Sequence, residues 1–217
     1  MCGLAGIVGE VDLMEQVLLH MSAAQNHRGK ETPNSWVSSF IDARVGLMHN
    51  RMKTIDMAVA PKQPFEDNDT GLVVMLDGEI FNYEDVRRQL ENYYSFTTRG
   101  MCEVITKAYD RWGDGCFDRF EGYFSIVIYN RWSEELLLCR DRFGIKPLYY
   151  ATQRGNLFFA SEIKALFAGG IRSLLSAERW ASYLAYSTYG SPYETFWEGV
   201  HQLPAGFLLH YNGYSLV

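Results

Sequence analysis

The order of the predicted secondary-structure elements constrains the fold of this chain more than any other feature. Apolar runs typical of strands occur at residues 4–9, 35–40, 45–49, 72–76, 123–130, 135–141 and 206–211. Helical patterns occur at 12–24, 83–91, 102–112 and 176–186, and residues 157–167 predict a strand leading into a helix. Asp12 and Ser176 are the expected N-caps of the first and last helices. Strands in groups that look antiparallel, with paired helices between them, predict α+β layers and not a regular βαβ alternation.

The composition predicts a single folded domain of 217 residues, 47% of them hydrophobic, with a formal net charge of −6. The acidic balance argues against a nucleic-acid-binding surface, which needs clustered lysine and arginine. No window of about 18 uncharged apolar residues is present, so we expect no membrane span. The N-terminus also lacks the pattern of a signal peptide.

The cysteines indicate free thiols and no metal site. They stand at positions 2, 102, 116 and 139. None forms a CxxC pair and no histidine lies at zinc-ligand spacing, so we expect neither a metal nor another cofactor. Scattered cysteines are typical of a reducing compartment, which predicts a cytoplasmic protein. Cys102, Cys116 and Cys139 are expected to be core thiols, and His27 and His49 to be hydrogen-bonded structural histidines.

Cys2 directly follows the initiator methionine, and its position allows an unusual chemistry. A thiol is a poor nucleophile until it loses its proton to a base. An α-amino group has a pKa of about 7.7–8.0, close to the operating pH. If Met1 is removed, Cys2 therefore carries its own base. The alternatives are an incidental buried cysteine and a lipid anchor, which would need an apolar leader upstream.

Several motifs occur together in a characteristic order. They are "MCGLAGIVG", "QNHRGKETP", "HNRMKTID" (49–56), "LDGEIFNY" (76–83), "GYFSIVIYN", "RDRFGIKPLYY" (140–150) and "FFASEIKAL" (158–166). In this order they resemble the glutaminase domain of asparagine-synthetase-type enzymes, the class II glutamine amidotransferases. The resemblance covers residues 2–210. It implies that residues 211–217 are a tail leading toward a synthetase domain that this sequence does not contain.

The resemblance implies a fold and a reaction. The fold is the four-layer αββα sandwich of N-terminal nucleophile hydrolases. The reaction is the hydrolysis of glutamine to glutamate and ammonia through a thioester on Cys2. A companion ATP-dependent synthetase domain or subunit would receive the ammonia, because no SGGxDS-like phosphate loop is present here. Self-association into a homo-oligomer is left open.

The resemblance also assigns candidate residues around the substrate. Arg51 would pair with the α-carboxylate of glutamine, which suits a planar guanidinium. Glu79 would contact the α-ammonium group, and the main-chain N–H of Gly78 would face the oxyanion. The main chain of Thr54 and Ile55 would line the glutamine pocket.

Two positions depart from the family pattern. Asp77 stands where the family has an asparagine whose amide donates a hydrogen bond to the oxyanion; an ionised aspartate can only accept, whereas a protonated one could donate. Met101 stands where an acidic residue is usual, so Glu79 would face the substrate ammonium alone. We keep Asp77 as a candidate catalytic residue and Met101 as a candidate substrate-binding residue. Lys30, at a usual proline position, is expected to alter only a loop.

Three interpretations follow from these observations. The leading one is an active amidotransferase glutaminase, which the presence of Cys2 favours. The second is a scaffold or regulatory module without turnover, which Asp77 and Met101 favour. The third is hydrolysis of a different amide in a related pocket. In all three, the "RDRFGIKPLYY" block is expected to be structural, with buried Arg–Asp pairs and a strand that starts near the proline.

Overall fold

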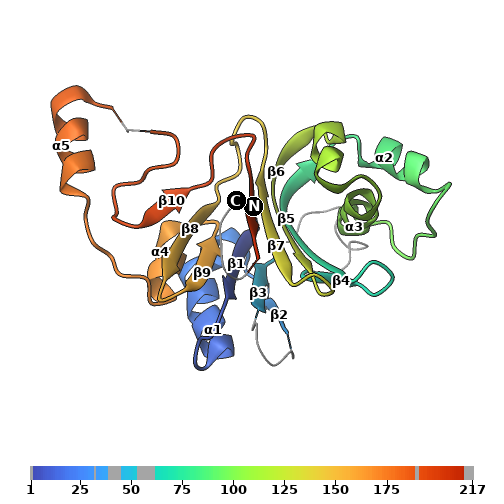
Figure 1. Cartoon of the computed structure of the whole chain (residues 1–217), viewed down its shortest axis with the longest axis horizontal. Coiled ribbons are helices and arrows are strands. Elements are labelled where there is room, and N and C mark those ends of the chain that lie inside the picture. The colour runs from blue at the N-terminus through green and yellow to red at the C-terminus, as the bar shows by residue number, and fades with distance from the viewer. Residues whose placement is uncertain (1, 32, 39–44, 53–61, 189–190, 213–217) are drawn as a thin grey trace.

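Two antiparallel β-sheets packed face to face form the centre of the molecule (Figure 1). The computed structural model describes residues 2–31, 33–38, 45–52, 62–188 and 191–212. The six-stranded sheet has the order β10-β8-β9-β1-β3-β2 and the five-stranded sheet the order β11-β7-β6-β5-β4.

The strands of the six-stranded sheet are β1 Gly3–Val8, β2 Asn34–Val37, β3 Val45–Asn50, β8 Tyr149–Gln153, β9 Asn156–Ala160 and β10 Val200–Gln202. Those of the five-stranded sheet are β4 Phe65–Asp67, β5 Leu72–Ile80, β6 Gly122–Asn130, β7 Glu135–Arg140 and β11 Leu208–Tyr211.

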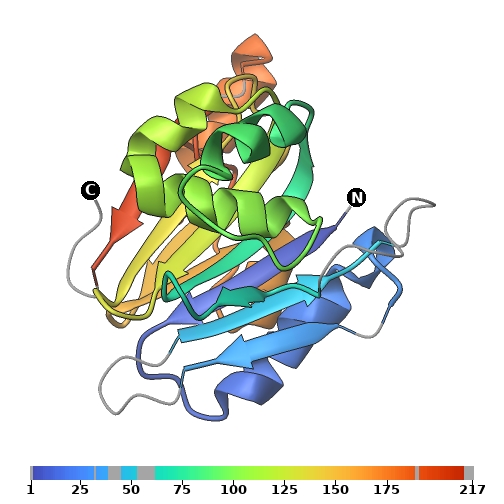
Figure 2. The same cartoon turned by 90° about the vertical axis from the view of Figure 1, so that its right-hand side faces the viewer.

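Helices cover the outer face of each sheet (Figures 1 and 2). Helices α1 (Met14–Ala24) and α4 (Ile163–Ala168) pack on the six-stranded sheet. Helices α2 (Tyr83–Leu90) and α3 (Met101–Trp112) pack on the five-stranded sheet. The resulting αββα order is the α+β fold class that the resemblance implies. A fifth helix, α5 (Ala177–Tyr186), lies apart from the layers and buries none of its residues (Figure 1).

Side-chain alternation along β5 explains how the core is divided. Val73 and Met75 point into the layer between the two sheets, whereas Val74 and Leu76 point toward α3 and its neighbours. Successive strand residues face opposite sides, so Asp77 continues the Val73–Met75 face and enters the layer between the sheets. An acidic residue is thereby directed into the most enclosed part of the fold.

Most of the expected strands and helices are present. The runs at 123–130 and 135–141 form the antiparallel pair β6–β7, as predicted. Ser176 caps α5 by accepting a hydrogen bond from the Arg179 main-chain N–H at 3.4 Å, also as predicted. The prediction that Asp12 caps the first helix is wrong, because the cap position falls on Leu13, which has a φ of 53° and makes no side-chain cap. The run predicted at 35–40 is described only to residue 38, and its strand ends at Val37.

The strand expected near the proline of the "RDRFGIKPLYY" block is β8, which begins at Tyr149, two residues after Pro147. Two short strands, β4 and β10, were not predicted. Each has three residues and a mixed pattern, and each is extended because it pairs with a neighbour distant in sequence or across a turn. Among the described residues, no helix has the length and apolar character needed to cross a bilayer.

Candidate active site

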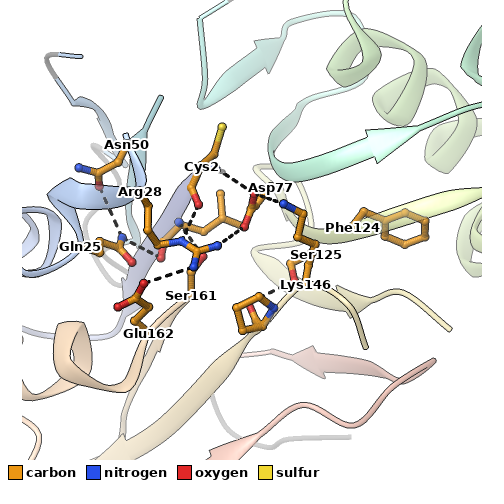
Figure 3. A network of polar contacts seen from close by, with 12 residues as sticks. Cys2, Gln25, Arg28, Asn50, Asp77, Phe124, Ser125, Lys146, Ser161 and Glu162 are labelled. Atoms are coloured by element: carbon orange, nitrogen blue, oxygen red, sulfur yellow. Dashed lines mark hydrogen bonds and ion pairs between the residues drawn. The ribbon is translucent and has the colours of Figure 1, made fainter. Parts of the chain in front are cut away.

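Cys2 lies directly before β1, in the layer between the two sheets (Figure 3). The register of β1 with β3 pairs Gly3 with Asn50, so Cys2 and Arg51 are neighbours at the ends of the two strands. The main-chain nitrogen of Cys2 donates a hydrogen bond to Oδ1 of Asp77 at 3.0 Å. This bond connects the six-stranded sheet to β5 of the five-stranded sheet. Met1 lies outside the described residues.

Asp77 has no exposed surface and accepts hydrogen bonds at both carboxylate oxygens. Oδ1 accepts from the Cys2 nitrogen and from Nζ of Lys146, both at 3.0 Å. Oδ2 accepts from Nη2 of Arg28 at 2.7 Å. Figure 3 shows Arg28 and Lys146 reaching Asp77 from two sides. Both cationic partners are buried, and in every hydrogen bond that the structure gives Asp77 the carboxylate is the acceptor.

Arg28 holds Cys2 and Asp77 with one guanidinium group. It lies on a 3₁₀ turn, Asn26–Arg28, and is almost fully buried. Its Nε donates to the Cys2 carbonyl at 2.8 Å, and its Nη1 donates to Oε1 of Glu162 at 3.2 Å. The planar fork of an arginine is suited to such simultaneous contacts.

The glycine after Arg28 allows this turn to approach β3. A Cβ atom at Gly29 would lie 2.5 Å from the main-chain carbonyl of Arg51 and 2.6 Å from that of Asn50. Only a residue without a side chain permits this contact. The "HRG" motif is therefore explained by a buried cation followed by a close crossing of two backbones. His27, beside Arg28, contacts Glu162 at 2.7 Å and confirms the expected hydrogen-bonded histidine.

The "RDRFGIKPLYY" block is structural, but its contacts differ from those predicted. The expected Arg–Asp pair is wrong for Arg140 and Asp141, which bind main-chain groups and not each other. Arg140 donates to the carbonyl oxygens of Lys146, Leu203 and Gly144. Asp141 accepts from the main-chain N–H groups of residues 124, 143, 145 and 146. These bonds hold the loop from which Lys146 reaches Asp77.

Burial decides the resting state of the Cys2 thiol. It raises the pKa of Cys2, and the Asp77 charge raises it further. The Met52 main-chain N–H and the Lys146 ammonium act in the opposite direction but do not cancel the increase. The thiol is therefore protonated at neutral pH and needs a base before it can act as a nucleophile.

The other three cysteines are buried free thiols, as predicted. Burial raises the pKa of Cys102 to about 12, with a smaller contribution from nearby Cys2. Burial likewise raises the pKa of Cys116 and of Cys139. Their environments disfavour the thiolate, which is the property of core thiols.

The described residues that were predicted to bind substrate lie on several elements. Glu79 is exposed on β5, two residues beyond Asp77, and accepts a hydrogen bond from the Tyr123 hydroxyl at 3.0 Å. Arg51 Nε lies 3.7 Å from Oε2 of Glu31. Met101 is the first residue of α3 and packs against the core of the five-stranded sheet. Thr54 and Ile55 lie outside the described residues.

Gly78 is required by the neighbouring strand. Its φ is 141°, and an added Cβ would lie 2.0 Å from the carbonyl oxygen of Tyr123 on β6. A side chain at this position is thus excluded by both backbone conformation and packing. The tight β5–β6 contact fixes the main chain directly after Asp77.

Among the described residues there is no group of three or more His, Cys, Asp or Glu side chains that could hold a metal ion. A surface cavity of about 740 Å³ lies elsewhere, lined by Thr152, Gln153, Arg154, Gly170, Ile171, Arg172, Leu174, Glu198 and Gly199. It contains none of the predicted site residues. The candidate site is therefore the buried polar cluster around Cys2 and Asp77.

The prediction missed Arg28, Lys146, Glu162 and Tyr123. One signal was available: Asp77 interrupts an apolar strand, and a buried carboxylate needs cationic partners. Arg28 of "QNHRGKETP" and Lys146 of "RDRFGIKPLYY" were the natural candidates for those partners.

His49 differs from the expected hydrogen-bonded histidine. It lies on β3, almost fully buried, and neither ring nitrogen makes a hydrogen bond of good geometry, although the main chain of Leu76 interacts with the ring and favours its protonated form. Burial lowers the pKa of His49 to about 4, against the opposing effect of Asp77. The side chain is therefore neutral in the folded protein at pH 7.

This buried histidine predicts a loss of stability in acid. Between its unfolded pKa near 6.5 and its folded pKa of about 4, the unfolded chain binds a proton that the folded chain does not. The free energy of unfolding should therefore fall with decreasing pH, by about 2 kcal/mol from this residue between pH 7 and pH 5. Urea denaturation of a His49→Leu variant should show a pH dependence smaller by that amount. His20→Leu, at an exposed position on α1, should keep the wild-type pH dependence; equal pH dependence in all three proteins would contradict the prediction.

Two antiparallel sheets between helical layers, with Cys2 at the start of a central strand, define the N-terminal nucleophile hydrolase fold. Solved structures of this class support the assignment. Glutamine phosphoribosylpyrophosphate amidotransferase from Bacillus subtilis, complexed with ADP and GMP, superimposes with a TM-score of 0.71 at 19% identity. The match covers 100% of this chain and 48% of that one. A second structure, titled as the allosteric regulatory enzyme of purine biosynthesis, gives a TM-score of 0.68 at 17% identity and covers 97% of this chain and 47% of that one.

Sequence comparison assigns the family. A family model described as "Glutamine amidotransferase domain" matches residues 1–215, and this chain belongs to that family, the class II glutamine amidotransferases. Asparagine synthetase [glutamine-hydrolyzing] 2 of Bacillus subtilis is 40% identical over 173 residues, which cover 77% of this chain and 22% of that protein. Amidase chry2 of Gibberella zeae is 32% identical over 183 residues, which cover 84% and 26% respectively. The predicted asparagine-synthetase-type resemblance and enzyme class are confirmed, and the chain spans about a quarter of the length of these two relatives.

Proposed function

We propose that this domain hydrolyses glutamine to glutamate and ammonia through a thioester on Cys2. The observation that carries the proposal is the placement of Cys2. Its thiol is buried and protonated, and its own nitrogen is held 3.0 Å from the Asp77 carboxylate. Removal of Met1 would convert that nitrogen into an amine, which is a base of suitable pKa attached to the same residue as the thiol.

The reaction balances as follows. The amine accepts the Sγ proton, and the thiolate attacks the side-chain amide carbon of glutamine. The ammonium then returns its proton to the leaving nitrogen, so that ammonia departs and a thioester forms. Water attacks the thioester, which releases glutamate and restores the thiol. The main-chain N–H of Gly78 would stabilise the oxyanion of each tetrahedral intermediate.

The remaining candidate residues would hold the amino-acid part of glutamine. Arg51 would bind the α-carboxylate and Glu79 the α-ammonium group. Tyr123 supports the second role, because its hydroxyl orients the Glu79 carboxylate at 3.0 Å. The Thr54 and Ile55 main chain and Met101 would complete the pocket.

We infer that the ammonia passes to an ATP-dependent synthetase domain or subunit. The relatives named as glutamine-hydrolysing asparagine synthetases are several times longer than the matched region. Residues 2–210 would form the glutaminase domain, and 211–217 would lead toward the synthetase. Four free buried thiols support a reducing cytoplasmic location.

Covalent labelling tests the proposal. The full chain should release glutamate and ammonia from glutamine, and a diazo-ketone glutamine analogue should add once per chain. Peptide mapping should place the adduct on a Cys2 that has lost its methionine, and glutamine should protect against labelling. A retained Met1, or an adduct on another residue, would contradict the mechanism.

Two alternatives have their own support. Both oxygens of Asp77 accept hydrogen bonds from its partners and offer no donor to an oxyanion, which favours a module that binds partners without turnover. Two relatives are named amidases, chry2 of Gibberella zeae and chyE of Penicillium rubens, which favours hydrolysis of another amide. No labelling of Cys2 would support the first alternative. A Cys2-dependent activity that glutamine does not inhibit would support the second.

A further inference from the structure

We propose that Asp77 is a positioning residue that holds the α-amino group of Cys2 and stabilises its protonated form during the reaction, in place of an oxyanion-donating amide. This inference rests on the proposed function, because it concerns the base of that reaction. It assigns a role to the departure from the family pattern, which would otherwise indicate only a damaged site.

The contacts place Asp77 on the base and not on the substrate carbonyl. Its Oδ1 is 3.0 Å from the Cys2 nitrogen, and both of its oxygens are already acceptors. Arg28 fixes this geometry, since one guanidinium binds the Cys2 carbonyl at 2.8 Å and Asp77 Oδ2 at 2.7 Å. The nitrogen and the carboxylate are therefore held by a shared support.

The charge of Asp77 is what an asparagine could not supply. When the thiol proton moves to the amine, a positive charge develops 3.0 Å from Oδ1 in a site with little water. A carboxylate stabilises that ammonium, much as the buried aspartate of a Ser-His-Asp triad stabilises the imidazolium. An amide would accept the same hydrogen bond without the charge.

The other charged and titratable groups around the pair set the sign of the expected effects. Arg28 comes from the 3₁₀ turn and Lys146 from the loop before β8. His49 on β3 and Tyr123 on β6 interact electrostatically with Asp77, and Cys102 on α3 interacts with Cys2. Arg51 follows β3 next to Cys2, and Glu162 is connected to the pair through Arg28. With Asp77 neutralised, Arg28 and Lys146 repel the ammonium and lower the pKa of the amine. With Lys146 neutralised, Asp77 is less compensated and the pKa of the amine rises.

The test is the pH dependence of kcat/KM for glutamine. The acid limb of this profile reports the pKa of the Cys2 α-amino group in the free enzyme. In Asp77→Asn, the acid limb should move to lower pH by about one unit, and kcat should fall by about 10²-fold. In Lys146→Met, the acid limb should move to higher pH. If Asp77 and Lys146 had only structural roles, the two substitutions would not move the acid limb in opposite directions.

Asp67→Asn provides a matched control, because Asp67 is a second buried aspartate paired with a lysine, Lys107, outside the site. It should leave the acid limb unchanged. A kcat that rises in Asp77→Asn with an unmoved acid limb would overturn the inference and restore the oxyanion role. If Asp77→Asn does not fold, the absence of an upward shift in Lys146→Met overturns it alone. Failure of the proposed function is distinct, since the wild type would then neither hydrolyse glutamine nor be labelled on Cys2.

Discussion

Replacing Cys2 by alanine is expected to reduce glutamine hydrolysis by at least about 10³-fold, because no other described thiol has a base attached to its own residue. Cys102 is the matched control. It is also buried, and it lies close enough to Cys2 to be influenced by its charge, but its pKa is raised to about 12. Cys102→Ala should retain glutamine hydrolysis within about twofold of the wild type, as expected for a thiol outside the chemistry.

Glutamate release at saturating glutamine, with circular dichroism to verify folding, distinguishes the two thiols. Activity that persists in Cys2→Ala would exclude Cys2 as the nucleophile. Loss in Cys102→Ala alone would move the chemistry to α3.

Replacing Arg28 by methionine is expected to lower the free energy of unfolding by about 3–5 kcal/mol. The change removes one cation from Asp77 and leaves the Cys2 carbonyl and Glu162 without that donor. Lys146 stays on Asp77 but does not reach the other two acceptors in the structure. A buried charge that loses a partner is costly because its desolvation is no longer offset.

Arg88→Met is the control for this stability measurement. Arg88 pairs with Asp85 on the exposed face of α2, and surface pairs of this kind contribute about 0–1 kcal/mol. Urea denaturation of both variants at one pH gives the comparison. Equal losses would contradict the interpretation of Arg28 as a buried clamp.

Strands and helices with strong hydrophobic periodicity were predicted from the sequence. The shortest strands were not, because their extended conformation depends on pairing with strands elsewhere in the chain. The β6–β7 hairpin and helices α2 and α3 have clear periodicity and were predicted from it. β10 has only three residues and is extended because Val200–Gln202 pairs with β8. No local pattern encodes such a pairing.

The candidate site likewise combines residues that a local motif indicated with residues that only long-range contacts bring together. Cys2 and Asp77 were each singled out by motif, but nothing local indicated that they touch across 75 residues of sequence. Arg28 and Lys146 are 49 and 69 residues from Asp77; Arg28 was given no role, and Lys146 lay in a block expected to be structural. Asp77 lies in a strand that is otherwise apolar on that face. Because a buried carboxylate needs oppositely charged partners, a search for cations that pair with Asp77 would have pointed to Arg28 and Lys146.

Cys2 directly precedes β1 of one sheet and Asp77 lies on β5 of the other, and hydrogen bonds from the Cys2 main-chain nitrogen and from Arg28 join them. Neither sheet carries the reactive centre alone. A small slide of one sheet over the other would separate the Cys2 nitrogen from the Asp77 carboxylate without breaking any strand. The proposed chemistry therefore depends on the docking of the two sheets, and we expect a collapsed form with intact strands but loose packing to show no glutamine hydrolysis.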